Sequence, residues 1–305
     1  MNPSQPLTAR VIVNRYWEHY FGTGLVKTVE DFGVQGERPS HPALLDWLAT
    51  EFMSSGWDVK HIQRLILTSA TYRQSSQARP DAYGRDPDNR LLARGPRFRV
   101  DAEVLRDSLL YVGGLLVEKR GGPPVKPYEP PGLWEAVSYN NAQKYVPDAG
   151  EAQYRRSLYT YLKRQSPPPN MLIFDAPSRE FCVARRARTN TPLQALDLLN
   201  DPQFVEASRA LAQRMILEGG ATATQRLAYG FRLATGRRPR SDELKVLAGV
   251  LNQELSEYKQ NTAAAQQLLG VGQFKTRENL DCQDLAAWTT IASLMLNLDE
   301  TLTKG

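Results

Sequence analysis

The sequence predicts a mainly α-helical protein, and three observations support this fold class. Apolar residues recur at helical spacing along much of the chain, no segment keeps the alternating pattern of a half-buried strand, and several helix starts carry proline or capping residues. We expect an irregular arrangement of about nine helices with one long Pro-rich loop. The 305 residues, 41% of them hydrophobic, supply enough apolar surface for one large core or two smaller ones.

The first part of the chain, residues 1–75, predicts an N-terminal helical lobe. An apolar stripe from Ala9 to Tyr20 predicts the first helix, which Gly22 should end. Pro42 opens a second helix and Asp58 caps a third one. The short connections between these helices favour packing into one lobe.

The second part, residues 76–190, predicts one helix and a long loop-rich segment. Asp101 starts the helix, whose apolar stripe continues to Leu116. Residues 119–150 contain six prolines and predict a functional loop, a partner surface or a partly disordered segment. The aromatic residues of this loop either stack on sugar rings or, as we favour, pin the loop to the body; they are Tyr128, Trp134, Tyr139 and Tyr145. Residues 156–164 fit a strand or a helix.

The third part, residues 191–305, predicts a C-terminal helical lobe. Thr191, Pro192 and Gln194 have the order of a capping box with proline at the first helical position. Asp201 restarts a helix, Ser241 caps another, and apolar residues at helical spacing over 285–298 predict the last one. We expect the three parts to form one compact unit.

Four arginines lie within ten residues directly before the helix start at Thr191, and they are the leading candidate for a binding site. Guanidinium groups beside the free amides of a helix N-terminus can hold a carboxylate, sulfate or phosphate. The candidate anion- or partner-binding set is Arg155, Arg156, Arg179, Arg185, Arg186, Arg188 and Asn190. The alternative, which we favour for the arginines before Thr191, is architectural bridging to the chain's own acids, such as Asp175, Glu180 and Asp201.

The charge balance also favours internal pairing. The chain has 28 arginines and 33 acidic residues, so every guanidinium group can have its own carboxylate. Nucleic acid is a disfavoured ligand, because residues 179–188 contain a single aromatic side chain for base stacking.

No set of residues amounts to a catalytic signature, so the sequence identifies no catalytic residue. Acid–base chemistry is the alternative hypothesis, with Asp31, His41, Asp175 and Glu180 as its candidates. The three histidines lack the spacing of metal ligands, and we expect neither a metal site nor a cofactor. The two cysteines, Cys182 and Cys282, form either one disulfide or, as we favour, two unrelated buried thiols. No apolar run approaches the roughly 20 residues of a membrane span.

Several sequence blocks in a fixed order carry a family resemblance. The chain resembles the planctomycete-type domain of unknown function with the catalogue number fifteen fifty-three, over about Pro6 to Lys304. The blocks are Asn14-Arg-Tyr-Trp, Phe21-Gly-Thr-Gly-Leu-Val, Asp31-Phe-Gly, Pro39-Ser-His-Pro-Ala-Leu-Leu-Asp-Trp-Leu-Ala, Tyr154-Arg-Arg-Ser-Leu-Tyr, Phe174-Asp-Ala-Pro-Ser-Arg-Glu, Arg188-Thr-Asn-Thr-Pro-Leu-Gln-Ala-Leu and Asn297-Leu-Asp-Glu.

The resemblance implies a terminal domain of exported proteins that also carry a cytochrome-c-like domain and another uncharacterised domain. This chain has neither a Cys-x-x-Cys-His haem site nor a signal peptide, so haem chemistry and export are not carried over to it. The resemblance alone implies a periplasmic or extracellular location. We therefore expect a binding or assembly module of an extracytoplasmic, cytochrome-associated system, which recognises a companion domain or an anionic polymer such as a glycan. The alternative is a hydrolase that acts on a polysaccharide or a sulfated substrate.

Overall fold

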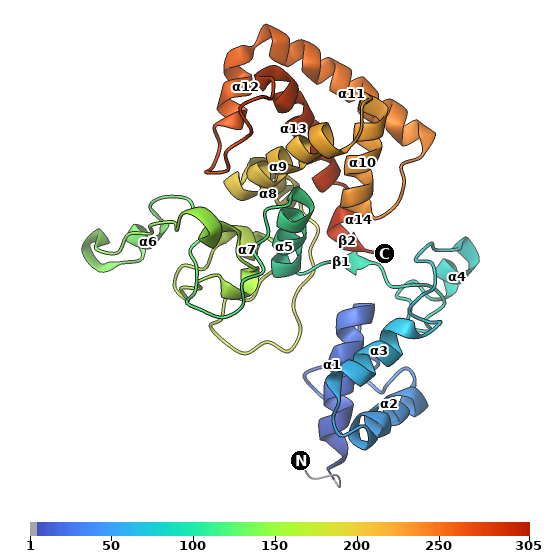
Figure 1. The fold of residues 1–305 in the computed structure, drawn as a ribbon. Coiled ribbons are helices and arrows are strands. Elements are labelled where there is room, and N and C mark those ends of the chain that lie inside the picture. The colour runs from blue at the N-terminus through green and yellow to red at the C-terminus, as the bar shows by residue number, and fades with distance from the viewer. Residues whose placement is uncertain (1–4) are drawn as a thin grey trace. The chain divides into compact units, whose positions relative to one another are not determined.

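The computed structural model describes residues 5–305, which fold into two units. Unit 1 contains the chain up to Phe98 together with Cys182–Arg186 and Thr303–Gly305, and unit 2 contains Arg99–Phe181 and Ala187–Leu302. The described residues form fourteen α-helices, three short 3-10 helices and two strands of two residues each (Figure 1). The prediction of a mainly α-helical fold is therefore confirmed.

Unit 1 is built on the three helices that the sequence predicts. Gly22 ends α1 in the left-handed conformation at φ 81°, where an added Cβ would lie 2.7 Å from a ring atom of Phe98. The Asp58 carboxylate caps α3 by accepting the His61 amide. Apolar side chains of the first three helices and of the loop after α1 form one core. The helices are α1 (Pro6–Phe21), α2 (Pro42–Ser54), α3 (Val59–Thr68) and α4 (Pro80–Arg85).

Unit 2 is arranged around α9, which has fully buried residues on all sides. Helices α5, α10 and α13 pack against it, and Gly113 at the end of α5 allows close approach because a Cβ there would lie 2.8 Å from the Ala207 carbonyl oxygen. The α-helices are α5 (Ala102–Gly113), α6 (Leu133–Ala136), α7 (Pro169–Ile173), α8 (Pro192–Asn200), α9 (Pro202–Glu218), α10 (Ala223–Thr235), α11 (Ser241–Gln260), α12 (Thr262–Leu269), α13 (Cys282–Leu296) and α14 (Asp299–Leu302). The 3-10 helices are η1 (Tyr139–Asn141), η2 (Gly150–Tyr154) and η3 (Ser157–Tyr159), and strand β1 (Phe98–Arg99) pairs with β2 (Thr303–Lys304).

Four local predictions need correction. Helix α5 ends at Gly113, because Gly114 adopts φ 80° and reverses the chain, so Leu116 lies beyond the helix. Arg240, not Ser241, is the N-cap of α11, and the Glu243 carboxylate accepts the Arg240 amide at 2.7 Å. Residues 156–164 form neither a strand nor an α-helix but a 3-10 turn with isolated bridges, including Val125 with Thr160. Both cysteines are free thiols, but Cys182 is exposed and Cys282 half-buried.

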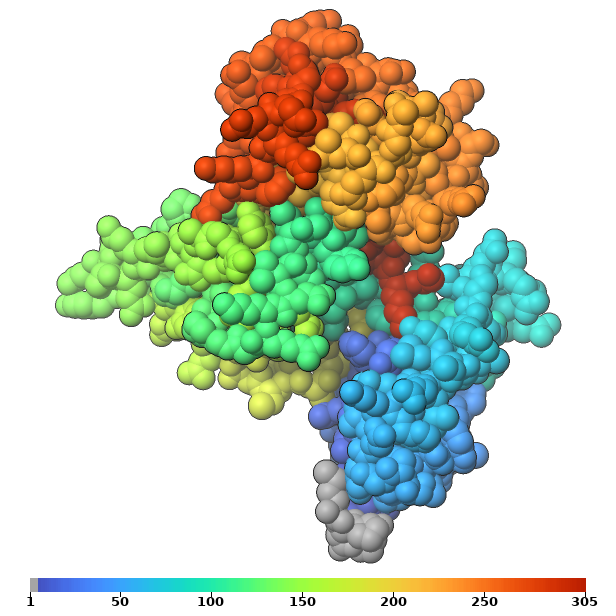
Figure 2. Space-filling model, in the orientation of Figure 1, coloured from blue at the N-terminus to red at the C-terminus, as the bar shows by residue number. Residues whose placement is uncertain are grey.

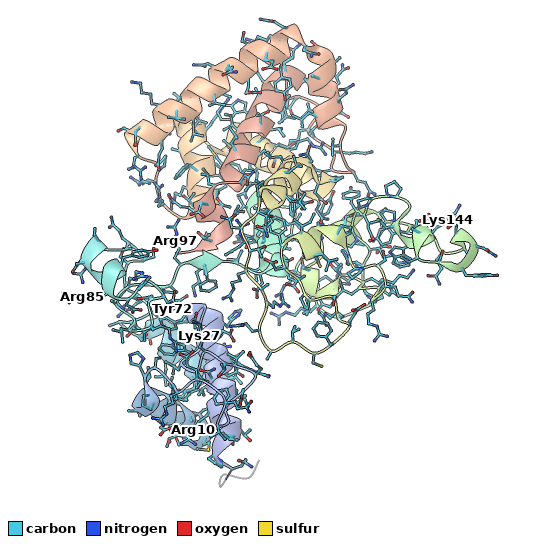
Figure 3. All side chains as sticks on the ribbon, turned by 180° about the vertical axis from the view of Figure 1, so that it is seen from behind. Arg10, Lys27, Tyr72, Arg85, Arg97 and Lys144 are labelled. Atoms are coloured by element: carbon cyan, nitrogen blue, oxygen red, sulfur yellow. The ribbon has the colours of Figure 1, made fainter. Side chains whose placement is uncertain are left out.

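The Pro-rich loop is ordered by its own aromatic side chains. The Tyr128 hydroxyl donates to the Glu206 carboxylate of α9 at 3.0 Å, and the Tyr145 hydroxyl donates to the Pro127 carbonyl at 2.5 Å. Trp134 is buried and packs edge-on against Tyr145. Tyr139 contributes nothing of this kind, since it is 88% exposed. Three of the four predicted aromatic residues therefore pin the loop, which projects from the helices of unit 2 with Lys144 near its outer end (Figures 2 and 3).

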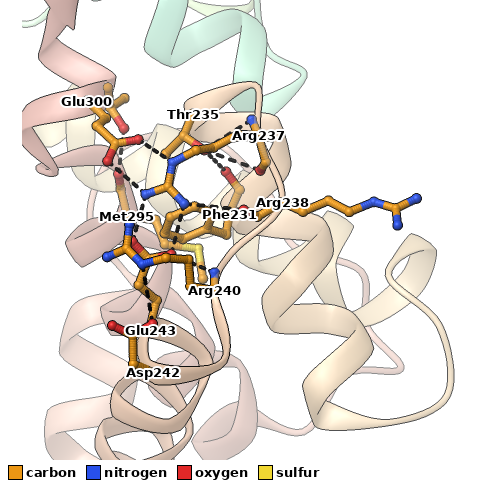
Figure 4. A network of polar contacts seen from close by, with 10 residues as sticks. Phe231, Thr235, Arg237, Arg238, Arg240, Asp242, Glu243, Met295 and Glu300 are labelled. Atoms are coloured by element: carbon orange, nitrogen blue, oxygen red, sulfur yellow. Dashed lines mark hydrogen bonds and ion pairs between the residues drawn. The ribbon is translucent and has the colours of Figure 1, made fainter. Parts of the chain in front are cut away.

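An ion-pair network joins the turn after α10 to the start of α11 and to α14 (Figure 4). Arg237 donates to Glu243 at 2.6 and 2.8 Å and to Glu300 at 2.7 Å from each of two nitrogens. Hydrogen bonding to Arg237 lowers the pKa of Glu243 from 4.5 to about 2. Such a bidentate network is more favourable than an isolated surface ion pair.

We expect the Arg237→Gln variant to lose about 1 kcal/mol of stability near neutral pH, the upper range for partly exposed pairs. The folded-state pKa of Glu243 lies below its unfolded value, so this stabilisation is present above about pH 4.5 and is lost as the pH falls toward 2. Urea unfolding from pH 7 to pH 2.5 should show the difference from wild type shrinking with acid.

The control is Arg238→Gln, because the neighbouring Arg238 side chain is exposed and points away from the network (Figure 4). A difference between Arg237→Gln and wild type that stays constant across this pH range would contradict the assigned role of the two carboxylates.

Candidate functional site

The four arginines before α8 belong to both units. Arg185 and Arg186 lie in unit 1, whereas Arg179 and Arg188 lie in unit 2. Arg186 is half-buried and the other three are exposed on irregular backbone. Within residues 5–305, neither Arg179 nor Arg185 has a carboxylate at ion-pair distance, whereas Arg186 and Arg188 interact with other groups. Arg179 and Arg185 are therefore exposed to solvent and are not held by internal acids.

The polar groups at the N-terminus of α8 form hydrogen bonds with neighbouring residues of the chain. The Asn190 side-chain oxygen accepts a hydrogen bond from Arg99 at 2.6 Å, and the Asp175 carboxylate accepts both the amide and the hydroxyl of Thr189. The Gln194 side-chain oxygen accepts a hydrogen bond from the Thr191 amide at 3.3 Å, which confirms the predicted capping box. Asn190 and Asp175 thus fix the local backbone, and this helix end offers no open anion site.

Arg155 is a buried structural residue. Its guanidinium group donates to the carbonyl oxygens of Pro123, Lys119 and Gly121 at 3.0, 3.1 and 2.5 Å. It also lies 3.9 Å from the centroid of the Tyr159 ring. Three of its donors therefore hold the beginning of the Pro-rich loop and are not available to a ligand.

The next residue, Arg156, has the opposite environment. Its side chain is 49% exposed, and its Nε lies 3.7 Å from the Asp107 carboxylate, beyond hydrogen-bond distance. Among the described residues, no acceptor forms a hydrogen bond with its guanidinium group. Arg155 and Arg156 are adjacent in the sequence, but the first is buried and structural and the second is exposed.

The Asp107 carboxylate already has partners within the protein. One of its oxygens accepts the amide and the hydroxyl of Ser157, each at 2.7 Å, and lies 3.5 Å from Arg106. Arg106 is almost fully buried and donates to Gln203, Ser157 and the carbonyl oxygens of Gln153 and Arg155. Burial lowers the pKa of Arg106 to about 10, which leaves it cationic at neutral pH. The negative charge of Asp107 is therefore balanced from inside the protein.

Arg156 opens onto a cavity of about 630 Å³ that lies entirely in unit 2. Arg120 and Glu118, both exposed, line it together with Asp107, and the exposed Tyr111 contributes an aromatic ring. Val104, Val112 and Leu116 provide apolar lining, and Ser108 and Thr301 provide hydroxyl groups. The lining contains two guanidinium groups, Arg120 and Arg156, and two carboxylates, Asp107 and Glu118, while the buried Arg106 adds a positive charge behind Asp107. The cavity can therefore accept a polar ligand that carries negative charge.

A family model described as "PSD1: Protein of unknown function (DUF1553)" matches residues 1–251. The chain belongs to the PSD1 family. No curated protein and no solved structure matches it. The family assignment confirms the resemblance to this family of unknown function over residues 1–251, and by itself it assigns no activity.

The predicted acid–base residues of this PSD1-family chain lie in different places. Asp31 and His41 belong to unit 1, and Asp175 and Glu180 to unit 2. The Asp31 carboxylate accepts the Gly33 amide within its own turn, and the nearest polar partner of the His41 ring is Ser40 at 3.0 Å. Within each unit, no hydrogen bond connects the two candidates. Glu180 is exposed.

Sequence reasoning missed several buried ionisable groups. Arg106, Glu206 and Arg209 lie within the apolar stripes of α5 and α9. A charged residue on a buried helix face needs internal partners, so its position in such a stripe could have marked it as a buried ionisable group. Burial also raises the pKa of Glu129 and of Asp197, each to about 7, and each carboxyl group has one buried oxygen without a hydrogen-bond partner.

Two negative findings concern the described part of the chain. Over residues 5–305, no cluster of three histidine, cysteine or carboxylate side chains is suited to a metal ion. In the same range, no helix combines the length and the apolar character needed to cross a bilayer.

The contrast between Arg155 and Arg156 predicts different effects on stability. Arg155→Gln should lower the free energy of unfolding by about 2–4 kcal/mol, because it removes a buried guanidinium group whose hydrogen bonds hold three loop carbonyls. Arg156→Gln should change it by less than about 0.5 kcal/mol, as is usual for exposed positions. Urea denaturation of both variants measures this, and equal losses would contradict the assigned roles.

Proposed function

We propose that this chain is a binding module that recognises anionic groups of an acidic polysaccharide. The observation that carries the proposal is the pair Arg120 and Arg156, whose guanidinium groups lie at one cavity without a hydrogen-bond partner among the described residues. Guanidinium groups form paired, charge-assisted hydrogen bonds with carboxylate and sulfate oxygens. A ligand anion would therefore find donors that no internal acceptor occupies.

The other lining groups favour a sugar-like ligand over a bare anion. Tyr111 is 66% exposed and offers a ring face to a pyranose. Glu118, Ser108 and Thr301 supply acceptors and hydroxyl groups for the hydroxyls of a sugar. Arginine then binds the anionic group of the ligand, and the other lining residues contact its sugar ring.

Arg179 of unit 2 and Arg185 of unit 1 are further candidate contacts, each within its own unit, because each is exposed and carries a guanidinium group that no internal acid neutralises. The family resemblance adds an extracytoplasmic setting and a companion domain of the same cytochrome-associated system. Such a domain is the other partner that the exposed arginines could engage. Nucleic acid is less well supported, since the cavity presents only one aromatic side chain, Tyr111.

The alternative proposal is a hydrolase acting on a polysaccharide or sulfated substrate. The contacts of Asp31 and His41 give it no support, because each is used locally. Glu129 and Asp197 suit general-acid chemistry better, since a pKa of about 7 keeps a carboxyl group partly protonated at neutral pH. Release of reducing ends or sulfate that stops in Glu129→Gln or Asp197→Asn would support a hydrolase.

Dextran, carboxymethyl dextran and dextran sulfate test the binding proposal, because they share one backbone and differ in charge. We expect the protein to bind the two charged polymers and not dextran. The double variant Arg120→Gln/Arg156→Gln should bind at least about tenfold more weakly, since a hydrogen bond to a charged group contributes about 1.5–3 kcal/mol. Biolayer interferometry at a fixed, moderate salt concentration measures this.

The matched control is Arg238→Gln/Lys259→Gln, which removes the same net charge from exposed positions outside the cavity lining. Equal weakening in both double variants would show that only overall charge matters. Absence of binding to either charged polymer would overturn the proposal. Binding that persists in the cavity variant but falls in Arg179→Gln would move the site to the exposed arginine segment.

A further inference from the structure

A cage of aromatic rings in unit 1 surrounds the ammonium group of Lys304. The Nζ atom lies 4.4 Å from the ring centroid of Tyr72, 5.3 Å from that of Tyr20 and 5.5 Å from that of Phe98. All four residues belong to unit 1, and Figure 3 labels Tyr72. Three rings within about 6 Å of one cation satisfy the distance criterion for cation–π attraction.

The geometry of the cage is fixed by separate elements. Tyr20 comes from α1, Tyr72 follows α3, and Phe98 is in β1. The Tyr20 and Tyr72 rings are edge-on to one another, at 88° and 5.9 Å. All three rings are half-buried, so their faces are partly removed from water. The Tyr20 and Tyr72 rings pack against the core of unit 1, and the backbone pairing of β1 with β2 holds Phe98, so the walls do not depend on the Lys304 side chain.

Lys304 itself reaches the cage from the C-terminal segment 303–305. This segment pairs with β1, and Lys304 Nζ donates to the Tyr20 carbonyl oxygen at 2.7 Å. A carbonyl acceptor surrounded by aromatic faces is a suitable environment for an alkylammonium group. The lysine therefore occupies the position that such a ligand would take.

We propose that the Tyr20–Tyr72–Phe98 cage is a binding site for alkylammonium cations, with Lys304 as its resident occupant. Segment 303–305 competes with an external cation because Lys304 occupies the cage, and its covalent link to the fold gives an effective concentration in the millimolar range. The site is closed while segment 303–305 is in place and opens to an external amine when this segment is displaced. Neither the cavity of unit 2 nor its arginines takes part.

Lys304→Ala in the full chain tests this proposal, because it empties the cage without changing its walls. The probes are choline and 3,3-dimethylbutan-1-ol, which have nearly the same shape and differ by one positive charge. Ring resonances of Tyr20 and Tyr72 are followed by NMR. Choline should give a saturable shift in Lys304→Ala, with an affinity at least about tenfold higher than for the wild-type protein, in which Lys304 competes.

The neutral alcohol should bind at least about fivefold more weakly than choline, since cation–π attraction contributes about 1 kcal/mol or more. The double variant Lys304→Ala/Tyr72→Ala should lose choline binding, and its circular dichroism spectrum should match that of Lys304→Ala. No choline-induced shift in Lys304→Ala, or equal affinity for the two probes, would overturn the proposal and leave Lys304 as an anchor of segment 303–305 alone.

Discussion

Hydrogen bonds from buried guanidinium groups to backbone carbonyls hold the irregular parts of this protein. Arg155 donates to three carbonyls at the start of the Pro-rich loop, and Arg106 donates to two carbonyls around η2. Arg209 of α9 donates to the carbonyls of Leu269, Val271 and Phe274, between α12 and α13. Loops leave carbonyl groups without the partners that helices provide, and burying such groups is unfavourable. Arginine suits this task because one planar group carries five donors.

This arrangement also determines which charges remain for a ligand. Arg106 balances Asp107 from behind, and the backbone that it fixes places Arg156 at the mouth of the cavity. Also on α9, the Glu206 carboxylate accepts hydrogen bonds from Tyr128, Tyr154 and the amides of Gln273 and Phe274, and so complements Arg209. The Pro-rich loop and the loop after α12 are thereby attached to one helix. The exposed arginines Arg120 and Arg156 are functional candidates because the buried ones already have acceptors.

Local sequence signals predicted the helices well. They predicted poorly which groups the charged side chains bind. Gly22, Asp58, Pro192 and Asp201 mark helix ends through short-range geometry, and the structure has helix ends at each of them. Balanced composition suggested Arg–carboxylate pairs, whereas Arg106, Arg155 and Arg209 mainly bind carbonyls. Composition counts carboxylates but not unpaired carbonyls, which exist only once loops are folded. The cavity was equally hidden, since Arg120, Arg156 and Thr301 are distant in sequence.

The central claim is that the fork of donors, rather than the positive charge, makes these arginines structural. Arg209→Lys tests it most directly, because lysine keeps the charge near Glu206 but lacks the planar group that reaches three carbonyls. Hydrogen–deuterium exchange resolved to residues 269–274, together with urea unfolding, provides the measurement. We expect faster exchange in this loop and a loss of about 2–4 kcal/mol in unfolding free energy. Exchange and stability equal to those of the wild-type protein would contradict the account.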